Sequence, residues 1–142
     1  MEFSNPPDAE IRRMLATPAT VAVVGCSNNP QRDSLKIAVL LKRKGFRVIP
    51  VNPRLEPDAL LGPLGERCYP ALGAIAGPVE IVDVFRRPEY LPQIAAEAIA
   101  KGARVLWCQL GVVNHEAAIR AQAAGITVVM DRCPAIEYRR LF

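Results

Sequence analysis

The segment from Gly25 to Ser34 combines residue types that are typical of a phosphate-binding loop. Gly25 permits a sharp turn, the hydroxyl of Ser27 can donate a hydrogen bond, and the guanidinium of Arg32 can make charged hydrogen bonds to phosphate oxygens. A helix is expected to begin near Asp33, and its first N–H groups and positive dipole end would face the same loop. We therefore predict that this loop binds a phosphate group.

Polar residues also follow four other apolar runs of the sequence. These segments are Asn52-Pro53-Arg54, Phe85-Arg86-Arg87, Gln109-Leu110-Gly111 and Asp131-Arg132-Cys133. Arg54 is informative because NAD-binding proteins usually carry an acidic residue at the end of the second strand, where it binds the ribose hydroxyls. An arginine there either favours a ribose with an additional phosphate, as in NADP or in the 3′-phosphorylated ADP of coenzyme A (CoA), or is a solvated surface residue.

The common nucleotide-binding and catalytic motifs are missing. Only Gly25 stands where the GxGxxG fingerprint requires three glycines, and the chain has no GxxxxGK[ST] sequence. The four cysteines, which we expect to be reduced, are Cys26, Cys68, Cys108 and Cys133. They form no CxxC pair, and the single histidine, His115, is expected near the start of a helix. We therefore expect no metal site and no complete catalytic set.

Apolar, β-branched runs alternate with segments of helical periodicity, which indicates βαβ units. The predicted strands are 20–25, 47–52, 79–85, 103–109 and 126–131, and the predicted helices run over 33–44, from Pro88 to Gly102 and from Asn114 to Gly125. Asp33 or Ser34 is expected to cap the first of these helices. We predict one three-layer, Rossmann-like α/β domain over residues 1–142, with a five-stranded, mainly parallel sheet. Right-handed crossovers would place the carboxyl end of every strand at one edge, so the polar segments should meet there.

Composition limits the remaining possibilities. With 142 residues, 51% of them hydrophobic, the chain can build one core, to which a helix in the first 19 residues would add Ile11, Met14 and Leu15. Residues 55–78, rich in Pro and Gly, are expected to form a short helix within a mobile connection. The net charge of +4 is scattered, which argues against a nucleic-acid partner, and no apolar stretch approaches the roughly 20 residues of a membrane span. Because no secretion signal is recognisable, we expect a cytoplasmic protein.

Five motifs in order resemble those of a known family. They are Val23 to Ser34 (VVGCSNNPQRDS), Val48 to Pro53 (VIPVNP), Val82 to Arg86 (VDVFR), Trp107 to Gly111 (WCQLG) and Asp131 to Cys133 (DRC). The chain resembles the small CoA-binding-domain proteins, which are similar to the amino-terminal CoA-binding domain of the succinyl-CoA synthetase α subunit. The resemblance covers nearly the whole chain and implies a Rossmann-like domain that binds CoA.

The resemblance also implies roles for individual residues. The residues implied to bind the cofactor are Gly25, Cys26, Ser27, Pro30, Arg32 and Ser34 around the ADP phosphates, Asn52, Pro53 and Arg54 near the adenosine, Val84, Phe85 and Arg86 on the adenine and pyrophosphate side, and Gln109 and Gly111 nearer the pantetheine arm. Two positions depart from the family: Cys26 stands where alanine is frequent, and Tyr138 stands in place of a histidine. Cys26 could form a mixed disulfide with CoA under oxidation.

Three functions are compatible with these residues. The preferred one is a non-catalytic module that holds CoA or an acyl-CoA as a carrier, sensor or regulator. The alternatives are an NADP-linked oxidoreductase, which Arg54 would permit, and the CoA-binding subunit of a larger acyl-CoA ligase. Ligase chemistry itself would require a phosphorylated histidine in a separate domain and a nucleotide-binding partner protein, which lie outside the resemblance.

Overall fold

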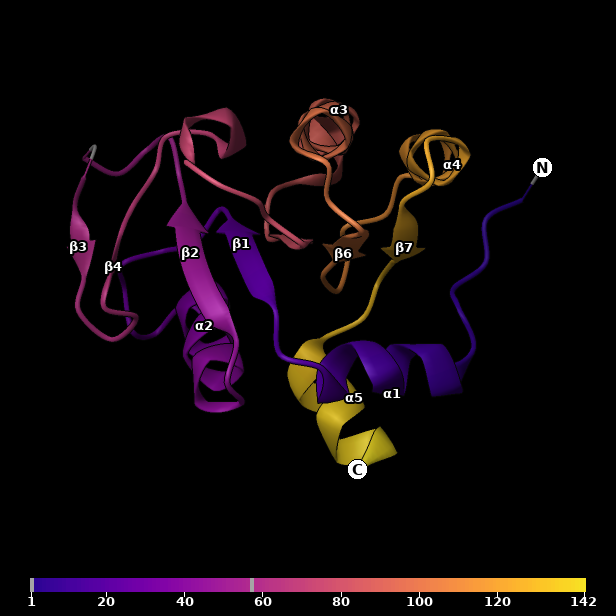
Figure 1. The fold of residues 1–142 in the computed structure, drawn as a ribbon, viewed down its shortest axis with the longest axis horizontal. Helices are drawn as coiled ribbons and strands as arrows, with labels where there is room; N and C mark the ends of the chain where they lie inside the picture. The colour runs from indigo at the N-terminus through magenta and orange to yellow at the C-terminus, as the bar shows by residue number, and fades with distance from the viewer. Residues whose placement is uncertain (1, 57) are drawn as a thin grey trace.

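A five-stranded parallel sheet forms the centre of the protein (Figure 1). The computed structural model describes residues 2–56 and 58–142. The strands are β1 (Thr20–Val24), β2 (Arg47–Val51), β5 (Ile81–Val84), β6 (Val105–Cys108) and β7 (Thr127–Val129), in the order β2-β1-β5-β6-β7. All neighbouring strands pair in parallel, which confirms the predicted Rossmann-like α/β fold.

Helices cover both faces of this sheet. The helices are α1 (Asp8–Ala16), α2 (Asp33–Arg43), α3 (Leu91–Lys101), α4 (His115–Ala123) and α5 (Pro134–Leu141). Figure 1 shows α3 and α4 on one face and α1, α2 and α5 on the other. Side chains of β1 alternate between the two cores: Ala22 packs in the core on the α3 side, whereas Val21 and Val23 pack on the α2 side. Each strand is therefore buried on both faces, as its continuous apolar sequence predicts.

Helix boundaries follow local chemistry at most points. Gly102 ends α3 in the left-handed conformation with a φ of 79°, and the Asn114 side chain accepts a hydrogen bond from the Ala117 N–H at the start of α4. The helix predicted from Pro88 begins instead with a 3-10 turn, Pro88–Tyr90, that leads into α3. The predicted cap of α2 is wrong, because Arg32 occupies the cap position and makes no side-chain capping bond.

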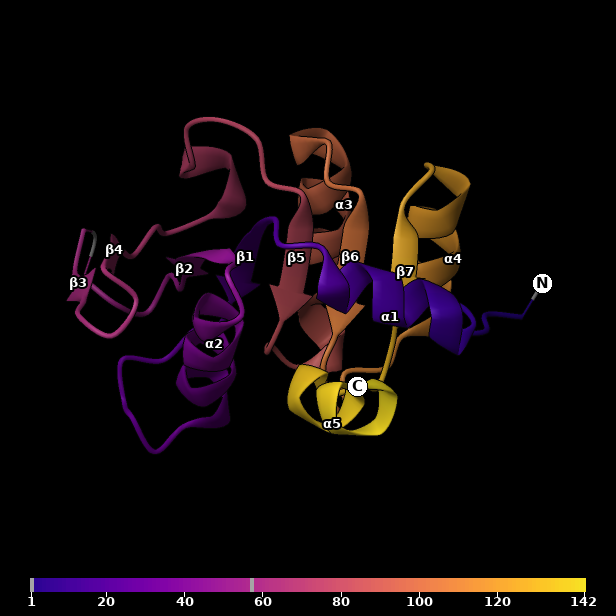
Figure 2. The same ribbon diagram turned by 60° about the horizontal axis from the view of Figure 1, so that its bottom comes forward.

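The connection between β2 and β5 differs from the prediction. It contains the short strands β3 (Leu60–Leu61) and β4 (Glu66–Arg67), which form an antiparallel hairpin, and a 3-10 turn at Leu72–Ala74. Figure 2 shows this hairpin beyond β2, at the end of the molecule opposite β7. The predicted short helix is thus limited to one 3-10 turn, and the hairpin was not predicted.

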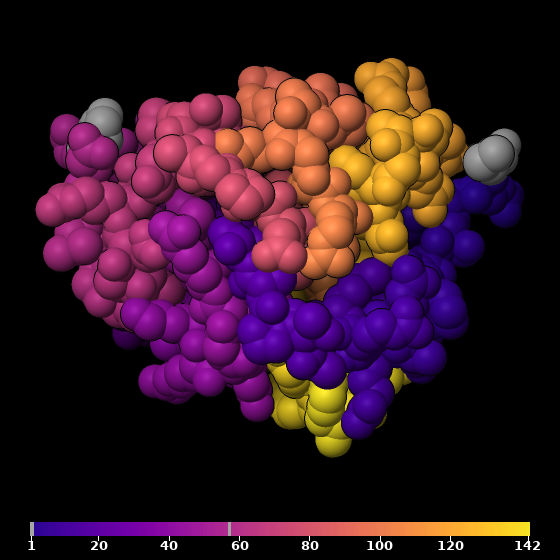
Figure 3. Space-filling model, in the orientation of Figure 1, coloured from indigo at the N-terminus to yellow at the C-terminus, as the bar shows by residue number. Residues whose placement is uncertain are grey.

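The two terminal helices pack against each other. In α1, Ile11 and Leu15 are buried as predicted, whereas Met14 is only partly buried. The helix α5 was not predicted, and its Arg140 binds Asp8 of α1 through two hydrogen bonds of 2.7 and 2.8 Å. Figure 3 shows the indigo amino-terminal residues lying against the yellow carboxyl-terminal ones. In the described part of the chain, no helix has the length and apolar character needed to cross a bilayer.

Candidate functional site

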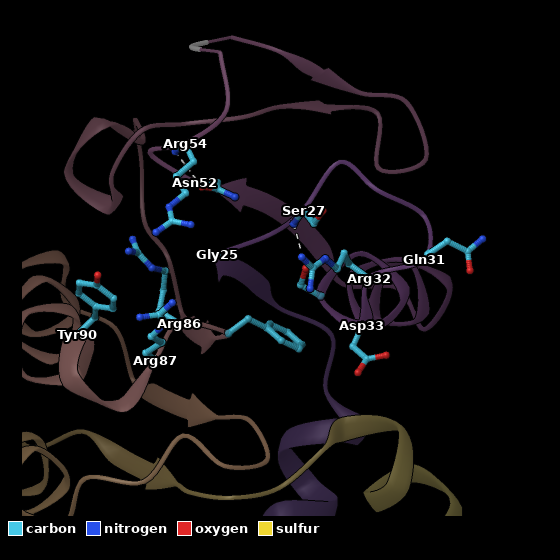
Figure 4. A pocket seen from close by; sticks show the side chains of 12 residues that line it. Gly25, Ser27, Gln31, Arg32, Asp33, Asn52, Arg54, Arg86, Arg87 and Tyr90 are labelled. Atoms are coloured by element: carbon cyan, nitrogen blue, oxygen red, sulfur yellow. Dashed lines mark hydrogen bonds between the residues drawn. The ribbon is translucent and has the colours of Figure 1, made fainter.

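An open cleft of about 590 Å³ lies at the carboxyl ends of β1, β2 and β5 (Figure 4). Its lining residues are Gly25, Ser27, Gln31, Arg32, Asp33, Ser34, Asn52, Arg54, Phe85, Arg86, Arg87 and Tyr90. They come from the loops that follow three adjacent strands, as the topology predicted. The predicted phosphate loop forms one wall of this cleft.

Gly25 makes the turn that opens the loop. Its φ of +89° is rarely adopted by residues with a side chain, and its N–H donates to the Val51 carbonyl at 2.7 Å. A Cβ atom at this position would lie 3.3 Å from Cγ and Cδ of Arg86 and from the carbonyl carbon of Phe85. Glycine therefore allows the loop after β1 and the loop after β5 to approach each other.

Internal hydrogen bonds hold the rest of the loop in shape. The Ser34 hydroxyl oxygen accepts from the Ser27 N–H, and the Ser27 hydroxyl oxygen accepts from the Asn29 N–H, both at 2.9 Å. Ser34 is buried, so its role is to fix the loop rather than to face the cleft. The Ser27 hydroxyl can still donate its hydrogen to a ligand.

Asn52 links the loops after β1 and β2. Its side-chain Nδ2 donates to the Cys26 carbonyl at 3.0 Å, and its Oδ1 accepts from the Arg54 N–H at 2.9 Å. Both polar groups of the amide are thus bonded to backbone atoms. Asn52 therefore positions Arg54 and the phosphate loop relative to each other.

Four arginines give the cleft a positive potential. Within residues 2–56 and 58–142, Arg32, Arg54 and Arg86 form no ion pair, and Arg87 faces only Glu89, at 3.7 Å on the surface. Arg86 instead stacks on Tyr90, with Cζ 4.2 Å from the ring centroid. In Figure 4 Arg32 lies on one side of Gly25, and Arg54, Arg86 and Tyr90 lie on the other. Positive groups that surround a glycine turn without carboxylate partners are suited to a ligand with several phosphates.

The cleft contains eight of the fourteen predicted cofactor residues. The other six are Cys26, Pro30, Pro53, Val84, Gln109 and Gly111, none of which lines it. Cys26 and Val84 are fully buried, whereas Pro30 and Pro53 are exposed outside it. No ligand role was predicted for Gln31, Asp33, Arg87 and Tyr90, which line the cleft. The only signal for Tyr90 was its position four residues after Arg86, which one turn of helix brings onto the same side.

Burial also changes what Cys26 can do. Desolvation raises the pKa of the Cys26 thiol to about 12, with smaller contributions from Cys68 and Asp83. The thiol is fully buried and remains protonated at neutral pH. This placement argues against the predicted mixed disulfide between Cys26 and CoA.

The loops after β6 and β7 form a second polar region. Gln109 is buried, and its Nε2 donates to Oδ1 of the fully buried Asp83 on β5. Burial raises the pKa of the Asp83 carboxyl to about 7, although the bond from Gln109 lowers it in part. The N–H of Gly111 donates to Oδ1 of Asp131 at 2.8 Å. The polar groups here bind one another, and over the described residues no cluster of three potential metal ligands occurs.

Comparison with known proteins supports this interpretation. Residues 19–139 match the family described as "CoA binding domain". The chain belongs to this family. The uncharacterized protein YneT of Bacillus subtilis is 40% identical over 131 residues, which are 92% of this chain and 93% of YneT. A solved structure of a hypothetical protein from Pyrococcus horikoshii OT3 covers 99% of both chains with a TM-score of 0.86 and 36% identity.

The family also connects the chain to a larger enzyme. The ADP-forming acetate–CoA ligase II of Archaeoglobus fulgidus is 30% identical over 92 residues. These residues are 63% of this chain but only 13% of the ligase. The chain is therefore related to the CoA-binding portion of such ligases and not to the ligase as a whole.

Proposed function

We propose that the cleft binds CoA or an acyl-CoA through its 3′-phosphorylated ADP, and that the protein acts as a non-catalytic carrier, sensor or regulatory module. The observation that carries this proposal is the set of three guanidinium groups, from Arg32, Arg54 and Arg86, around the Gly25 turn without ion-pair partners in the described residues. Membership of the CoA-binding domain family supports the choice of ligand.

Each part of the proposed ligand has a suitable group in the cleft. The diphosphate would lie against the loop at Ser27, where the amino end of α2 and the Arg32 guanidinium favour negative charge. Arg54 would bind the 3′-phosphate of the ribose. The stacked pair Arg86 and Tyr90 would lie along the adenine and pyrophosphate side.

The cleft offers little for catalysis. Its polar side chains are arginines, amides and hydroxyls, with Asp33 as the one carboxylate among the lining residues. His115 lines a separate cavity near the amino terminus and contacts Phe3 edge-on at 6.0 Å between ring centroids. This arrangement supports a binding role. The buried or half-buried free thiols also fit a cytoplasmic protein, which is the location we propose.

A second candidate is a CoA-binding subunit of a larger acyl-CoA ligase. The relationship to part of the Archaeoglobus fulgidus ligase favours it. Affinity purification of the tagged protein from its native cells would distinguish the two functions. Stoichiometric recovery of an ATP-grasp protein would support the ligase subunit, whereas recovery of the protein with CoA alone would support the carrier.

Ligand identity is tested by mass spectrometry of the small molecule released from gently purified protein, followed by calorimetry with CoA, dephospho-CoA, NADP and NAD. We expect CoA to bind most tightly. The absence of binding to CoA at millimolar concentration, with binding to NADP, would refute the proposal and favour an oxidoreductase.

Arg54 provides a sharper test of ligand orientation. Because Arg54 is proposed to bind only the 3′-phosphate, Arg54→Gln should weaken binding of CoA about tenfold and leave binding of dephospho-CoA unchanged. Arg47→Gln is the matched control, since Arg47 lies at the opposite end of β2 and pairs with Glu66 at 3.2 Å. Equal losses for both ligands in Arg54→Gln would contradict the assignment.

A further inference from the structure

A second cavity of about 580 Å³ adjoins the cleft and lies between α2 and α5. Its lining residues are Asp33, Lys36, Ile37, Leu40, Arg43, Phe85, Gln109, Leu110, Cys133, Ala135, Ile136 and Arg139. We call it the α2–α5 groove. It shares Asp33 and Phe85 with the cleft, so the two cavities meet at the amino end of α2. A ligand held by its diphosphate in the cleft can therefore extend into the groove.

The walls of the α2–α5 groove are mainly apolar. Ile37 and Leu40 come from α2, Ile136 comes from α5, and Leu110 comes from the loop after β6. Leu110 and Ile136 are 57% and 43% exposed, which is high for large apolar side chains. Covering them with a hydrocarbon chain would remove apolar surface from water and favour binding.

The rim of the groove carries three positive charges. Lys36 and Arg43 lie on α2 and Arg139 lies on α5, and within the described residues none of them forms an ion pair. Asp33 is the one carboxylate of the lining, and it lies at the end shared with the cleft. Arg43 is ten residues further along α2, which corresponds to about 15 Å of helix. The net charge of the groove is therefore positive, and it is most positive away from the cleft.

We propose that the α2–α5 groove binds the acyl group of an acyl-CoA whose acyl chain ends in a carboxylate. The inference rests on the proposed function, because the cleft must hold the nucleotide end of the same molecule. An apolar chain would cover Leu40, Leu110 and Ile136, and its terminal carboxylate would meet Arg43 and Arg139. A purely apolar acyl group would use the walls of the groove but leave these cations without a partner.

The test compares two six-carbon thioesters that differ only at the end of the chain, hexanoyl-CoA and adipyl-CoA, with free CoA as the reference. Calorimetry on the full chain should show adipyl-CoA binding at least about fivefold more tightly than hexanoyl-CoA. In the double variant Arg43→Gln/Arg139→Gln the two affinities should become equal, while affinity for free CoA stays unchanged. Arg120→Gln on α4, an exposed arginine paired with Glu116 outside both cavities, should retain the wild-type preference.

The outcomes separate this inference from the proposed function. If free CoA binds but adipyl-CoA and hexanoyl-CoA bind equally to the wild type, the inference is overturned and CoA binding stands. If free CoA does not bind, the proposed function fails first. A wild-type dimer that Ile136→Glu converts to a monomer in analytical ultracentrifugation would show that a second copy covers the groove, and would also overturn the inference.

Discussion

The carboxyl edge of the sheet has two halves that use their polar residues differently. In the half formed by the loops after β1, β2 and β5, the guanidinium groups of Arg32, Arg54 and Arg86 face an open cleft without ion-pair partners in the described residues. Backbone and side-chain hydrogen bonds fix these loops, but the charges themselves are left available. We call this the cleft half.

In the half formed by the loops after β6 and β7, polar groups bind one another. Arg132 lies 3.4 Å from the buried carboxylate of Glu137, and its backbone carbonyl accepts a hydrogen bond from Nε1 of Trp107 at 3.0 Å. Asp131 accepts from the N–H of Gly111. We call this the paired half. The comparison teaches that an arginine after a parallel strand indicates a ligand only when no protein carboxylate neutralises it.

Substituting one arginine in each half should separate the two roles most clearly. Arg32→Ala should weaken CoA binding by about 1.5 to 3 kcal/mol, or roughly 10- to 100-fold, because a charged hydrogen bond to phosphate is lost. Its free energy of unfolding should change little, since Arg32 is exposed and unpaired in the described part of the chain. Calorimetry and urea denaturation measure the two quantities.

Arg132→Ala is the matched variant and should behave in the opposite way. Glu137 keeps Arg140 as a partner at 2.6 Å, so we expect a loss of about 1 kcal/mol of stability and no change in CoA affinity. A loss of affinity in Arg132→Ala, or its absence in Arg32→Ala, would remove the distinction between the two halves.

Two glycines with similar backbones sharpen the comparison at a smaller scale. Gly25 and Gly111 have φ values of +89° and +79°, so alanine is strained at either position, but only at Gly25 would its Cβ crowd Arg86. We expect both variants to lose about 1 kcal/mol of stability and only Gly25→Ala to lose CoA affinity, by about tenfold. Equal affinities for the two variants in calorimetry would show that the close approach of Arg86 to Gly25 is not needed for binding.

The sequence predicted the features that depend on local patterns. Continuous β-branched runs such as Thr20–Val24 predicted the strands, and the Gly102 stop and the Asn114 cap predicted helix ends. The shared edge of the strands then followed from right-handed crossovers, which placed Arg32, Arg54 and Arg86 together.

The features that escaped prediction depend on distant contacts. The helix α5 has a weakly apolar sequence and is stabilised by pairing between Arg140 and Asp8, 132 residues apart. Because α5 was not expected, the sequence could not show that Glu137 would neutralise Arg132 while Arg54 stayed free. The β3–β4 hairpin has only two residues per strand, too few to give a periodic signal.

The smallest expected effect concerns Asp83, which lies beneath the boundary of the two halves. Its Oδ2 has no hydrogen-bond partner within the described residues, and a cavity of about 20 Å³ adjoins it. Burial raises its pKa from 3.8 to about 7. Between these values the unfolded chain loses the proton and the folded protein keeps it, so the stability of the wild type should fall as pH rises from about 4 to about 7.

Asp83→Asn removes this titration and isolates it from all other groups. Relative to the variant, the melting temperature of the wild type should fall by a few degrees between pH 5 and pH 8, because only the wild type must bury a carboxylate at the higher pH. Gln109 can donate to the carboxamide oxygen of the substituted side chain as it does to Oδ1 of Asp83, so the loop after β6 should keep its position. CoA affinity should therefore be the same in both proteins. A parallel pH dependence of the two melting temperatures would show that Asp83 is ionised in the fold, and a loss of CoA affinity in Asp83→Asn would extend the cleft half to include Gln109.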